Sequence, residues 1–358
     1  MNIGPVRAAL AALVLTACAT PTVVPPVGPA VPPHRPLPPP APEPAPGEAL
    51  RPRFLSELPG WAAEDHAQAL EGFRAGCQAV RDPAVAPLCA EARTVAAADA
   101  RRWFESRFLA EPLPGEGVLT AYFAPVYEAR RRPDAEFSAP VRPKPADLVN
   151  GAPYADRAAI EARPADDAIA WMRPEELFFL QVQGSGVLTF EDGRRMKALY
   201  AANNGQPFVG IANPMRDRGL LARDATSGEA IRLWLAANRG PAADEIMRLN
   251  PRYAFFRLAP DDGRPPAGAA NVPLPGGRAI AVDPAHHAYG GFYWIDAEAP
   301  LLKGAFPTYR RLVAALDTGG AIKGPVRADL YLGEGGAAGA EAGRVRHTLR
   351  MFRLVPYR

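Results

Sequence analysis

The sequence predicts a mainly β protein with helices at its periphery, and three observations lead to this prediction. The 358 residues are 48% hydrophobic, which allows a sizeable core. Short alternating runs recur after residue 117 and are separated by turns rich in glycine and proline. Helical spacing of apolar residues is found mainly before residue 110 and again between residues 226 and 241. Short strands with such turns are typical of β-barrels.

Charge excludes one broad class of function. The chain carries 41 basic and 38 acidic residues, a net charge of +3. Proteins that bind nucleic acid through a global basic field have a much larger excess of lysine and arginine. We therefore expect no nucleic-acid partner.

The N-terminus has the plan of an export signal. Residues 1–17 contain Arg7, then an apolar stretch, then small residues before Cys18. The sequence Leu15-Thr-Ala-Cys18 resembles a bacterial lipobox, which implies cleavage before Cys18 and lipidation of that cysteine. The alternative is an ordinary signal peptide with an accidental cysteine. No other segment approaches the roughly 18 apolar residues that span a bilayer.

Residues 18–49 are predicted to form a proline-rich tether after the lipidated cysteine. Thirteen of the 27 residues from Pro21 to Gly47 are proline, and few others could contribute to a core. In polyproline II conformation this segment reaches up to roughly 80 Å. The globular sequence begins near Leu50.

Two helices are predicted next, at residues 61–80 and 96–109. Cys77 lies in the first of them, and Cys89 lies between the two. In an oxidising compartment a disulfide between these cysteines is favoured over a metal pair, and no histidine spacing supports zinc. If the protein stayed in the cytosol, two free buried thiols would be favoured instead.

The remaining elements are mostly strands. The turn at residues 191–193 and Asn204-Gly205 interrupt them, the second as either a hairpin turn or a loop at a site. Thr226 with Glu229 forms a capping box that begins a helix, Gly240 ends it, and Pro241 fits the first position of another. The predicted strands are residues 117–123, 177–183, 253–258, 278–282, 292–295, 309–316, 327–332 and 345–355.

Two aspartates follow or lie within predicted buried strands. Asp317 comes directly after the apolar run 312–316, where a carboxylate must be paired or have a shifted pKa. Alternation along residues 327–332 places Arg327, Asp329 and Tyr331 on one face, toward a groove. Such a carboxylate serves as a proton donor and then acceptor, with Asp317 as a neighbour that raises its pKa. The alternative is a structural ion pair between Asp329 and Arg327.

Other motifs point to no chemistry of their own. The segment Gln183-Gly-Ser-Gly186 lacks the first glycine of a nucleophile elbow, so Ser185 is interpreted as part of a turn that meets a polar ligand or is purely structural. Residues 320–324 do not have phosphate-loop spacing. The pair His286-His287 is interpreted as a solvated loop. We expect neither metal nor cofactor.

Several separate motifs resemble one known family. They are Gly117-Val-Leu-Thr-Ala-Tyr-Phe-Ala-Pro125, Phe178-Phe-Leu-Gln-Val-Gln-Gly-Ser-Gly186, Asn204-Gly205, Asn250-Pro-Arg-Tyr-Ala-Phe-Phe-Arg257 and Asp317-Thr-Gly-Gly-Ala-Ile-Lys-Gly324. Their order is similar to that of the membrane-bound lytic murein transglycosylase A family, over roughly residues 110–356. The C-terminal part resembles the 3D domain, named for three aspartates that correspond to Asp283, Asp317 and Asp329.

This resemblance implies a double-psi β-barrel built from residues 50–123 and 259–358. A smaller β-barrel-like domain, residues 124–258, would interrupt it, and a peptidoglycan glycan strand would lie between the two. Lys323, in the loop after Asp317, is expected to bind this substrate. The histidine-rich turn after Asp283 departs from the family pattern, so Asp283 is interpreted as structural.

The implied reaction is non-hydrolytic cleavage of the β-1,4 bond from N-acetylmuramic acid to N-acetylglucosamine, leaving a 1,6-anhydro end. Asp329 would be the single general acid and then base, and Asp317 would support it. The residues expected to position sugars are Tyr122, Gln183, Ser185, Gly186, Asn204 and Lys323.

Location and alternatives complete the expectations. Ala19 after the lipidated cysteine predicts a lipid anchor on the periplasmic face of the outer membrane, since aspartate there usually signals inner-membrane retention. Two other functions remain open. One is a peptidoglycan hydrolase in which Asp317 acts opposite Asp329. The other is a cell-wall-binding lipoprotein without catalysis. Partners in a wall-synthesis complex are not predicted.

Overall fold

The computed structural model describes residues 51–149, 151–222, 226–302 and 304–357. All of them belong to one compact unit. The predicted signal peptide, lipidated Cys18 and proline-rich tether lie outside the described residues. Within the described ranges, no helix is both long enough and apolar enough to span a bilayer.

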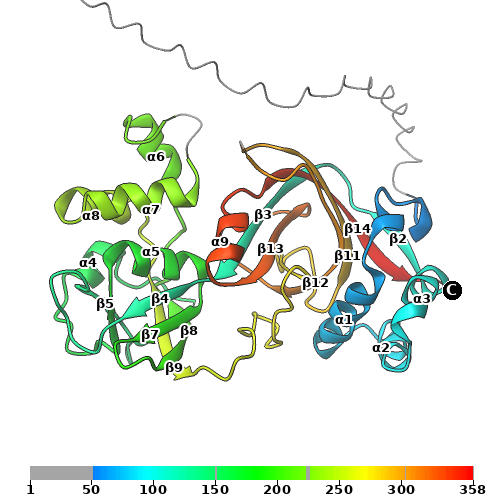
Figure 1. Cartoon of the computed structure of the whole chain (residues 1–358), viewed down its shortest axis with the longest axis horizontal. Helices are drawn as coiled ribbons and strands as arrows, with labels where there is room; N and C mark the ends of the chain where they lie inside the picture. Colours follow the sequence, from blue (N-terminus) through cyan, green and yellow to red (C-terminus); the bar gives the residue numbers. More distant parts are fainter. Residues whose placement is uncertain (1–50, 150, 223–225, 303, 358) are drawn as a thin grey trace, which may run out of the picture. The chain divides into compact units, whose positions relative to one another are not determined.

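The larger sheet contains eight strands in the order β1-β2-β14-β11-β12-β10-β13-β3. Figure 1 labels β2, β3, β11, β12, β13 and β14 of this sheet. Strand β14 also pairs with β3, so the six strands from β14 to β3 form a closed ring of pairings. Two pairs in the ring are parallel, β10 with β12 and β13 with β3. The strands are β1 (Arg53–Phe54), β2 (Phe108–Pro112), β3 (Gly117–Ala124), β10 (Ala279–Ala281), β11 (Phe292–Pro300), β12 (Tyr309–Asp317), β13 (Arg327–Glu334) and β14 (Arg346–Pro356).

The predicted strands in this sheet are therefore confirmed, with ends that differ by one to five residues. Alternation along each strand supplies two apolar faces. One face forms a core of residues such as Leu119, Ile280 and Leu330. The opposite face packs Trp294 and Phe292 against the N-terminal helices, which contribute Trp61 and other aromatic side chains. The ring thus has one buried core of its own and a second under a helical cover.

The helical cover consists of α1 (His66–Gly76), α2 (Ala86–Ala92) and α3 (Ala100–Arg107). The predicted helix 61–80 is present as α1 with short 3-10 helices η2 (Trp61–Ala63) and η3 (Cys77–Ala79) on either side, and η1 (Leu55–Glu57) and η4 (Ala97–Asp99) lie nearby. The predicted helix 96–109 ends earlier, because Phe108 starts β2 and pairs with β14. The sequence did not indicate α2.

The predicted disulfide is confirmed: Cys77 and Cys89 are bonded, with their Cα atoms 5.6 Å apart. It joins η3 to α2 and so fixes two short elements with little hydrogen bonding between them. Replacing both cysteines by serine is expected to lower the free energy of unfolding by about 3 kcal/mol, since the bond closes a short loop in the unfolded chain. Urea denaturation of the exported protein measures this. An unchanged midpoint would contradict a stabilising role.

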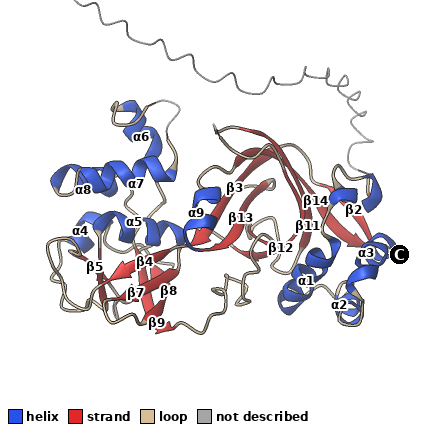
Figure 2. Ribbon diagram, viewed as in Figure 1, coloured by secondary structure: helices blue, strands red, loops and turns tan. Residues whose placement is uncertain are grey.

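The second part of the unit is a four-stranded sheet, β4-β7-β8-β9, with a separate pair β5-β6. No pairing among its described residues closes this sheet, so the prediction of a β-barrel-like inserted domain is wrong. Helices cover it instead: α5 lies along the sheet, and α7 and α8 form a further layer (Figure 2). The strands are β4 (Val126–Ala129), β5 (Ala139–Val141), β6 (Ala170–Met172), β7 (Gly186–Phe190), β8 (Arg195–Asn203) and β9 (Ala254–Pro260). The helices are α4 (Arg157–Glu161), α5 (Pro174–Gln183), α6 (Ala212–Asp217), α7 (Gly228–Ala237) and α8 (Pro241–Arg248), while α9 (Gly335–Ala342) follows β13.

Residues 177–183, predicted as a strand, form most of α5. Pro174 stands in the first turn, and Gly184 ends the helix with φ +86°. A short, uniformly apolar run does not distinguish a buried helix from a strand by period alone. The first-turn glutamates and the glycine stop were the deciding signals.

Smaller predictions met mixed outcomes. The turn at residues 191–193 joins β7 to β8 as predicted. Asn204-Gly205 is no hairpin turn, because the chain after β8 continues to α6. The cap of α7 is Ser227, which accepts from the Ala230 N–H, so the predicted Thr226 cap is displaced by one residue.

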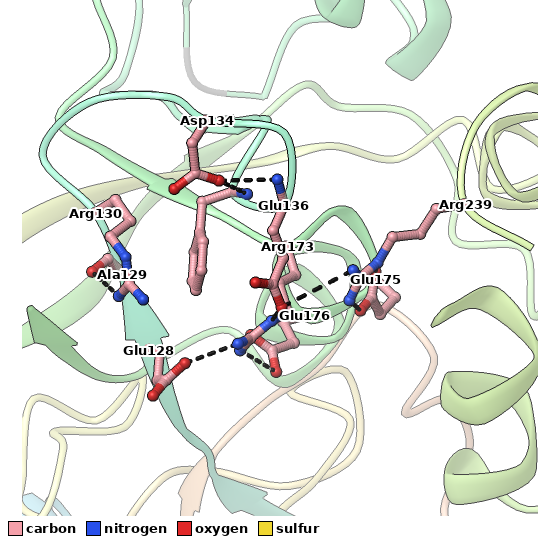
Figure 3. Close-up of polar contacts among 10 residues, drawn as sticks. Glu128, Ala129, Arg130, Asp134, Glu136, Arg173, Glu175, Glu176 and Arg239 are labelled. Atoms are coloured by element: carbon pink, nitrogen blue, oxygen red, sulfur yellow. Dashed lines mark hydrogen bonds and ion pairs between the residues drawn. The ribbon is translucent and has the colours of Figure 1, made fainter. Parts of the chain in front are cut away.

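Ion pairs fasten α5 to the sheet it covers (Figure 3). Arg173, which precedes α5, donates to Glu128 on β4 at 2.7 Å and to Glu136 at 2.6 Å. Glu175 in the first turn of α5 is 2% exposed and accepts two hydrogen bonds from Arg239, just after α7. A buried carboxylate requires such a partner. The network therefore fixes the helix that carries Gln183, one of the predicted binding residues.

Candidate active site

Strand β13 carries Asp329 as the alternation predicted. Ala328 and Leu330 are fully buried in the inner core, whereas Asp329 is half-buried on the other face. Strand register then aligns a row of residues across the sheet. Ala281 on β10 pairs with Asp317 on one side and with Asp329 on the other. Strand β10 therefore lies between the two strands that carry the carboxylates, and both carboxylates lie at about the same position along the strand direction.

A threonine that the sequence did not single out positions the carboxylate of Asp329. Thr120 on β3 pairs with Asp329 in the parallel register, and its hydroxyl donates to the Asp329 Oδ1. Arg327 donates in turn to the Thr120 Oγ1 at 2.8 Å. The guanidinium therefore acts through the threonine, and the described residues contain no Arg327–Asp329 ion pair. The alternative of a structural ion pair is thus not realised.

Burial raises the pKa of the Asp329 carboxyl above its ordinary value. The hydrogen bond from Thr120 and the charge of Arg327 oppose this, and the nearby charge of Asp317 adds to it. A carboxyl with a raised pKa holds its proton nearer to neutral pH, which is the requirement for a general acid.

Asp317 is held by its own partners. Its Oδ2 accepts from the Tyr122 hydroxyl at 2.7 Å, and its Oδ1 accepts from the Ala269 N–H at 2.9 Å. Burial raises the pKa of Asp317, and these hydrogen bonds limit the rise. No hydrogen bond between described atoms joins Asp317 to Asp329. Asp317 therefore interacts with Asp329 through charge rather than contact.

A pocket opens beside Asp329 between the two sheets. One wall is formed by β13 and the loop before it, and the other by α5 and the segments around β9. Its lining residues are Arg157, Gln181, Val182, Phe208, Asn250, Arg252, Ala254, Gly319, Gly320, Ala321, Ile322, Arg327 and Asp329. The pocket combines a proton donor with polar and apolar surface, as a sugar site requires.

None of the predicted substrate-binding residues lines this pocket. Asn204 is fully buried; its Nδ2 donates to two backbone carbonyls and its Oδ1 accepts from Tyr253. Gly186 is buried at the start of β7, where a Cβ would lie 2.7 Å from the Pro125 carbonyl oxygen. Close packing and internal hydrogen bonds occupy these two residues, so the structure adds no support to the prediction that they contact a sugar directly. Asn204 organises three loops instead.

The others remain partly accessible. Gln183 is half-buried, and its Oε1 accepts from the Phe123 N–H at 3.1 Å. Ser185 is half-buried in the turn between α5 and β7. The hydroxyl of Tyr122 is engaged with Asp317. Lys323 is largely exposed, with its Nζ 3.7 Å from Asp283.

The contacts of Asp283 agree with the interpretation of this residue as structural, which stays a prediction. Its side chain accepts from the Gly324 and Ala285 N–H groups, which lower its pKa and fix the loop that follows Asp317. The interpretation of His286-His287 as solvated is wrong for His287, which is 5% exposed and contacts the Tyr293 hydroxyl and the Pro325 carbonyl. Within the described ranges, no cluster of histidine, cysteine and acidic residues could hold a metal ion.

Comparison with known proteins agrees with this arrangement. Residues 118–257 match the MltA specific insert domain and residues 278–355 match the 3D domain. Membrane-bound lytic murein transglycosylase A of Vibrio cholerae is 34% identical over 255 residues, covering 67% of this chain and 66% of the relative. The same-named Escherichia coli K12 protein is 34% identical over 248 residues, with the same coverage. The chain thus spans about two thirds of the length of these curated relatives.

Solved structures extend the likeness over more of the chain. A membrane-bound lytic murein transglycosylase from Agrobacterium tumefaciens is 30% identical, with a TM-score of 0.76, and the alignment covers 86% of this chain and 98% of that one. The chain belongs to the membrane-bound lytic murein transglycosylase A family. Escherichia coli MltA with bound chitohexaose is 27% identical, with a TM-score of 0.67 and coverage of 82% and 90%.

The members of this family are named as enzymes. The site of this chain also contains residues that could not be selected from the sequence. These residues are Thr120, Gln181, Phe208 and Arg252. Thr120 lies in the motif of residues 117–125, but only the register of β3 with β13 brings it close to Asp329. Gln181 was assigned to a strand together with Gln183. Helical geometry separates the two, so that Gln181 reaches the pocket and Gln183 reaches β3.

Proposed function

We propose that this protein is a lytic transglycosylase that cleaves the β-1,4 bond between N-acetylmuramic acid and N-acetylglucosamine of peptidoglycan without water. The observation that carries the proposal is Asp329, a half-buried carboxyl with a raised pKa that lines the pocket. Family membership supports the substrate class. The chitohexaose bound to the Escherichia coli relative supports a glycan in the pocket.

The reaction needs one acid–base group. Asp329, protonated, donates its proton to the glycosidic oxygen as the bond from that oxygen to the anomeric carbon breaks. The 6-hydroxyl of the same muramyl sugar bonds to the anomeric carbon, and its proton passes to the Asp329 carboxylate. A 1,6-anhydro sugar results and Asp329 regains its proton. Ordinary glycosidases need a second carboxylate to attack or to activate water.

Neighbouring groups set the state of this acid. Asp317, one strand away from β13 across β10, favours the protonated form of Asp329 by its negative charge. Thr120 orients the carboxylate by its hydrogen bond. Since Asp317 is held by Tyr122 and a backbone N–H rather than facing water across the site, we assign it electrostatic support.

Sugar binding is assigned to polar groups on both sides of the pocket. The Gln181 amide makes only one hydrogen bond to a described residue, 3.4 Å to the Ala254 carbonyl, and its Oε1 accepts none. Because the Oε1 is buried, the Nε2 group is proposed to donate its remaining proton to a hydroxyl or an acetamido carbonyl of the glycan. Ser185, Gln183 and Lys323 are still proposed to contact sugars farther along the glycan strand. Tyr122 is proposed to act indirectly, through its hydrogen bond to Asp317.

The wider context follows from the family. We propose that the closed ring is a double-psi β-barrel, with residues 124–258 as the inserted domain. We further propose that a lipid at Cys18 anchors the protein at the periplasmic face of the outer membrane. The membrane-bound relatives support an association with a membrane.

The products test the proposal. Purified peptidoglycan is incubated with the protein, and the released muropeptides are analysed by mass spectrometry. Anhydro-muropeptides, which lack the mass of one water, are expected without new reducing ends. Reducing-end muropeptides alone would identify a hydrolase, and no release would favour a binding protein; either result overturns the proposal.

Thr120→Val is expected to move the pH dependence of the reaction. The hydroxyl stabilises the charged carboxylate, so its removal raises the pKa of Asp329 further. The acid is active below its pKa and inactive above it, and the alkaline limb of kcat/KM should therefore shift to higher pH. Initial rates of anhydro-muropeptide release across pH 4 to 9 measure the shift. A limb that stays in place or moves to lower pH contradicts the assignment.

A further inference from the structure

Arg157, Arg252 and Arg327 line the pocket, and their hydrogen bonding distinguishes them. Arg157 donates from Nε and both terminal nitrogens to two backbone carbonyls and Glu161. Arg327 donates to two backbone carbonyls and to Thr120. Both of these cations donate from both terminal nitrogens to other groups of the fold, and they position backbone and catalytic groups.

Arg252 differs. Its Nη1 donates to the Gln206 carbonyl at 3.1 Å, while its Nε and Nη2 donate to no described residue. The side chain is half-buried and makes no ion pair with any acidic group of the described residues. It lies against the loop after β12, since a Cβ on Gly320 would be 3.3 Å from the Arg252 Cζ. The guanidinium is thus fixed on one edge and free to donate on the other.

A fixed guanidinium with two free donors fits a carboxylate, which accepts both in one plane. Hydroxyl and acetamido groups, the only polar groups of N-acetylglucosamine, are neutral. The muramyl unit differs by its lactyl group, which ends in a carboxylate or carries a peptide with carboxylates. Of the glycan's two sugars, only the muramyl unit therefore supplies the partner that Arg252 lacks.

We propose that Arg252 binds a carboxylate carried by the muramyl unit and so makes the enzyme select peptidoglycan over neutral glycans. The proposal rests on the proposed function and adds the substituent that the site recognises. The carboxylate belongs to the lactyl group of peptide-free strands or to the stem peptide, and the substrates below distinguish these sources.

The test compares three glycan substrates. They are peptide-bearing strands, peptide-free strands with free lactyl carboxylates, and peptide-free strands whose lactyl groups are amidated and neutral. The variants are Arg252→Gln and Arg252→Lys, which keeps the charge but loses the planar fork. Arg132→Gln is the matched control, because Arg132 is exposed in a loop of the same part of the chain and does not line the pocket beside Asp329. Both kcat/KM and binding to an Asp329→Asn background are measured.

Arg252→Gln is expected to lower kcat/KM about tenfold on carboxylate-bearing strands and to leave the amidated strands unchanged. Arg252→Lys should lie between, and Arg132→Gln should match the unaltered protein on all three. An effect on peptide-free strands identifies the lactyl carboxylate, and an effect confined to peptide-bearing strands identifies the stem.

Equal losses on charged and amidated strands, or no loss, overturn the proposal. Failure of the proposed function is recognised separately, because the unaltered protein would then release no anhydro product from any strand. The binding measurement still decides carboxylate recognition in that case. A preference for charged strands that Arg252→Gln removes supports it, and a preference that survives the substitution refutes it.

Discussion

Asp329→Asn releases anhydro-muropeptides roughly 10³-fold more slowly than the unaltered protein, and it binds glycan strands with similar affinity: this is the largest effect expected. General acid–base catalysis contributes about 10² to 10⁴ in rate, and here one carboxyl performs both transfers. Asparagine keeps the shape and the hydrogen bond from Thr120 but cannot donate and regain a proton in this cycle. Mass spectrometry of the products and glycan binding by calorimetry measure the two quantities.

The control is Asp192→Asn, which removes an exposed carboxylate in the turn between β7 and β8 that does not line the pocket. Its rate should equal that of the unaltered protein. If Asp329→Asn kept a tenth of the activity, or if it lost glycan binding in parallel, Asp329 would not be the acid and base.

Unfolding measurements distinguish a variant that has lost catalysis from one that has lost its fold. Because the folded pKa of Asp329 is raised above its ordinary value of 3.8, its ionisation disfavours the fold. The stability associated with this group is complete below pH 3.8 and falls as pH rises through the folded pKa. Asp329→Asn should therefore be at least as stable as the unaltered protein at neutral pH, so that an inactive variant is not an unfolded one.

Glu64→Ala is expected to lower the free energy of unfolding by about 3 to 5 kcal/mol, the second large effect. The side chains of Glu64 and Arg278 are 3% and 5% exposed, and they form an ion pair at 2.9 Å. Glu64 also accepts from the Leu312 N–H on β12. The substitution leaves a buried guanidinium without its counterion and a buried N–H without its acceptor. Denaturant unfolding monitored by tryptophan fluorescence measures the loss.

Glu71→Ala provides the matched control in the same helical cover. Glu71 lies in α1 and pairs with Arg74, but its side chain is 67% exposed. Exposed pairs of this kind contribute less than about 1 kcal/mol. Similar losses for the two variants would mean that the buried ion pair does not account for the effect of Glu64.

Much of the larger sheet could be predicted from local pattern. Alternation along residues 327–332 identified both the strand and the face that carries Asp329, because side chains on a strand point to opposite sides in turn. The same reasoning failed for residues 177–183, where an apolar run without clear period forms α5. It also failed to predict that the smaller sheet is not closed into a barrel and is covered by helices. Closure of a sheet depends on which strands pair.

The residues of the site could likewise be predicted from the sequence only in part. The two aspartates could be selected from sequence because a carboxylate at the end of an apolar run is chemically conspicuous. Their partners could not. Thr120 is 209 residues from Asp329 along the chain, and Tyr122 is 195 residues from Asp317. Nothing local marks either pair, because parallel strands are joined by long connections and register is set by packing of whole faces.

The sequence by itself determined the strand alternation, the face of β13 that carries Asp329, the disulfide partners and the family. These depend on residue chemistry and on neighbours along the chain. Tertiary structure alone decided that Arg327 acts through Thr120, that Asn204 and Gly186 are buried, and that Arg252 faces the pocket with free donors. Hydrogen-bond partners and burial depend on which distant segments pack together, and a local pattern holds no information about that.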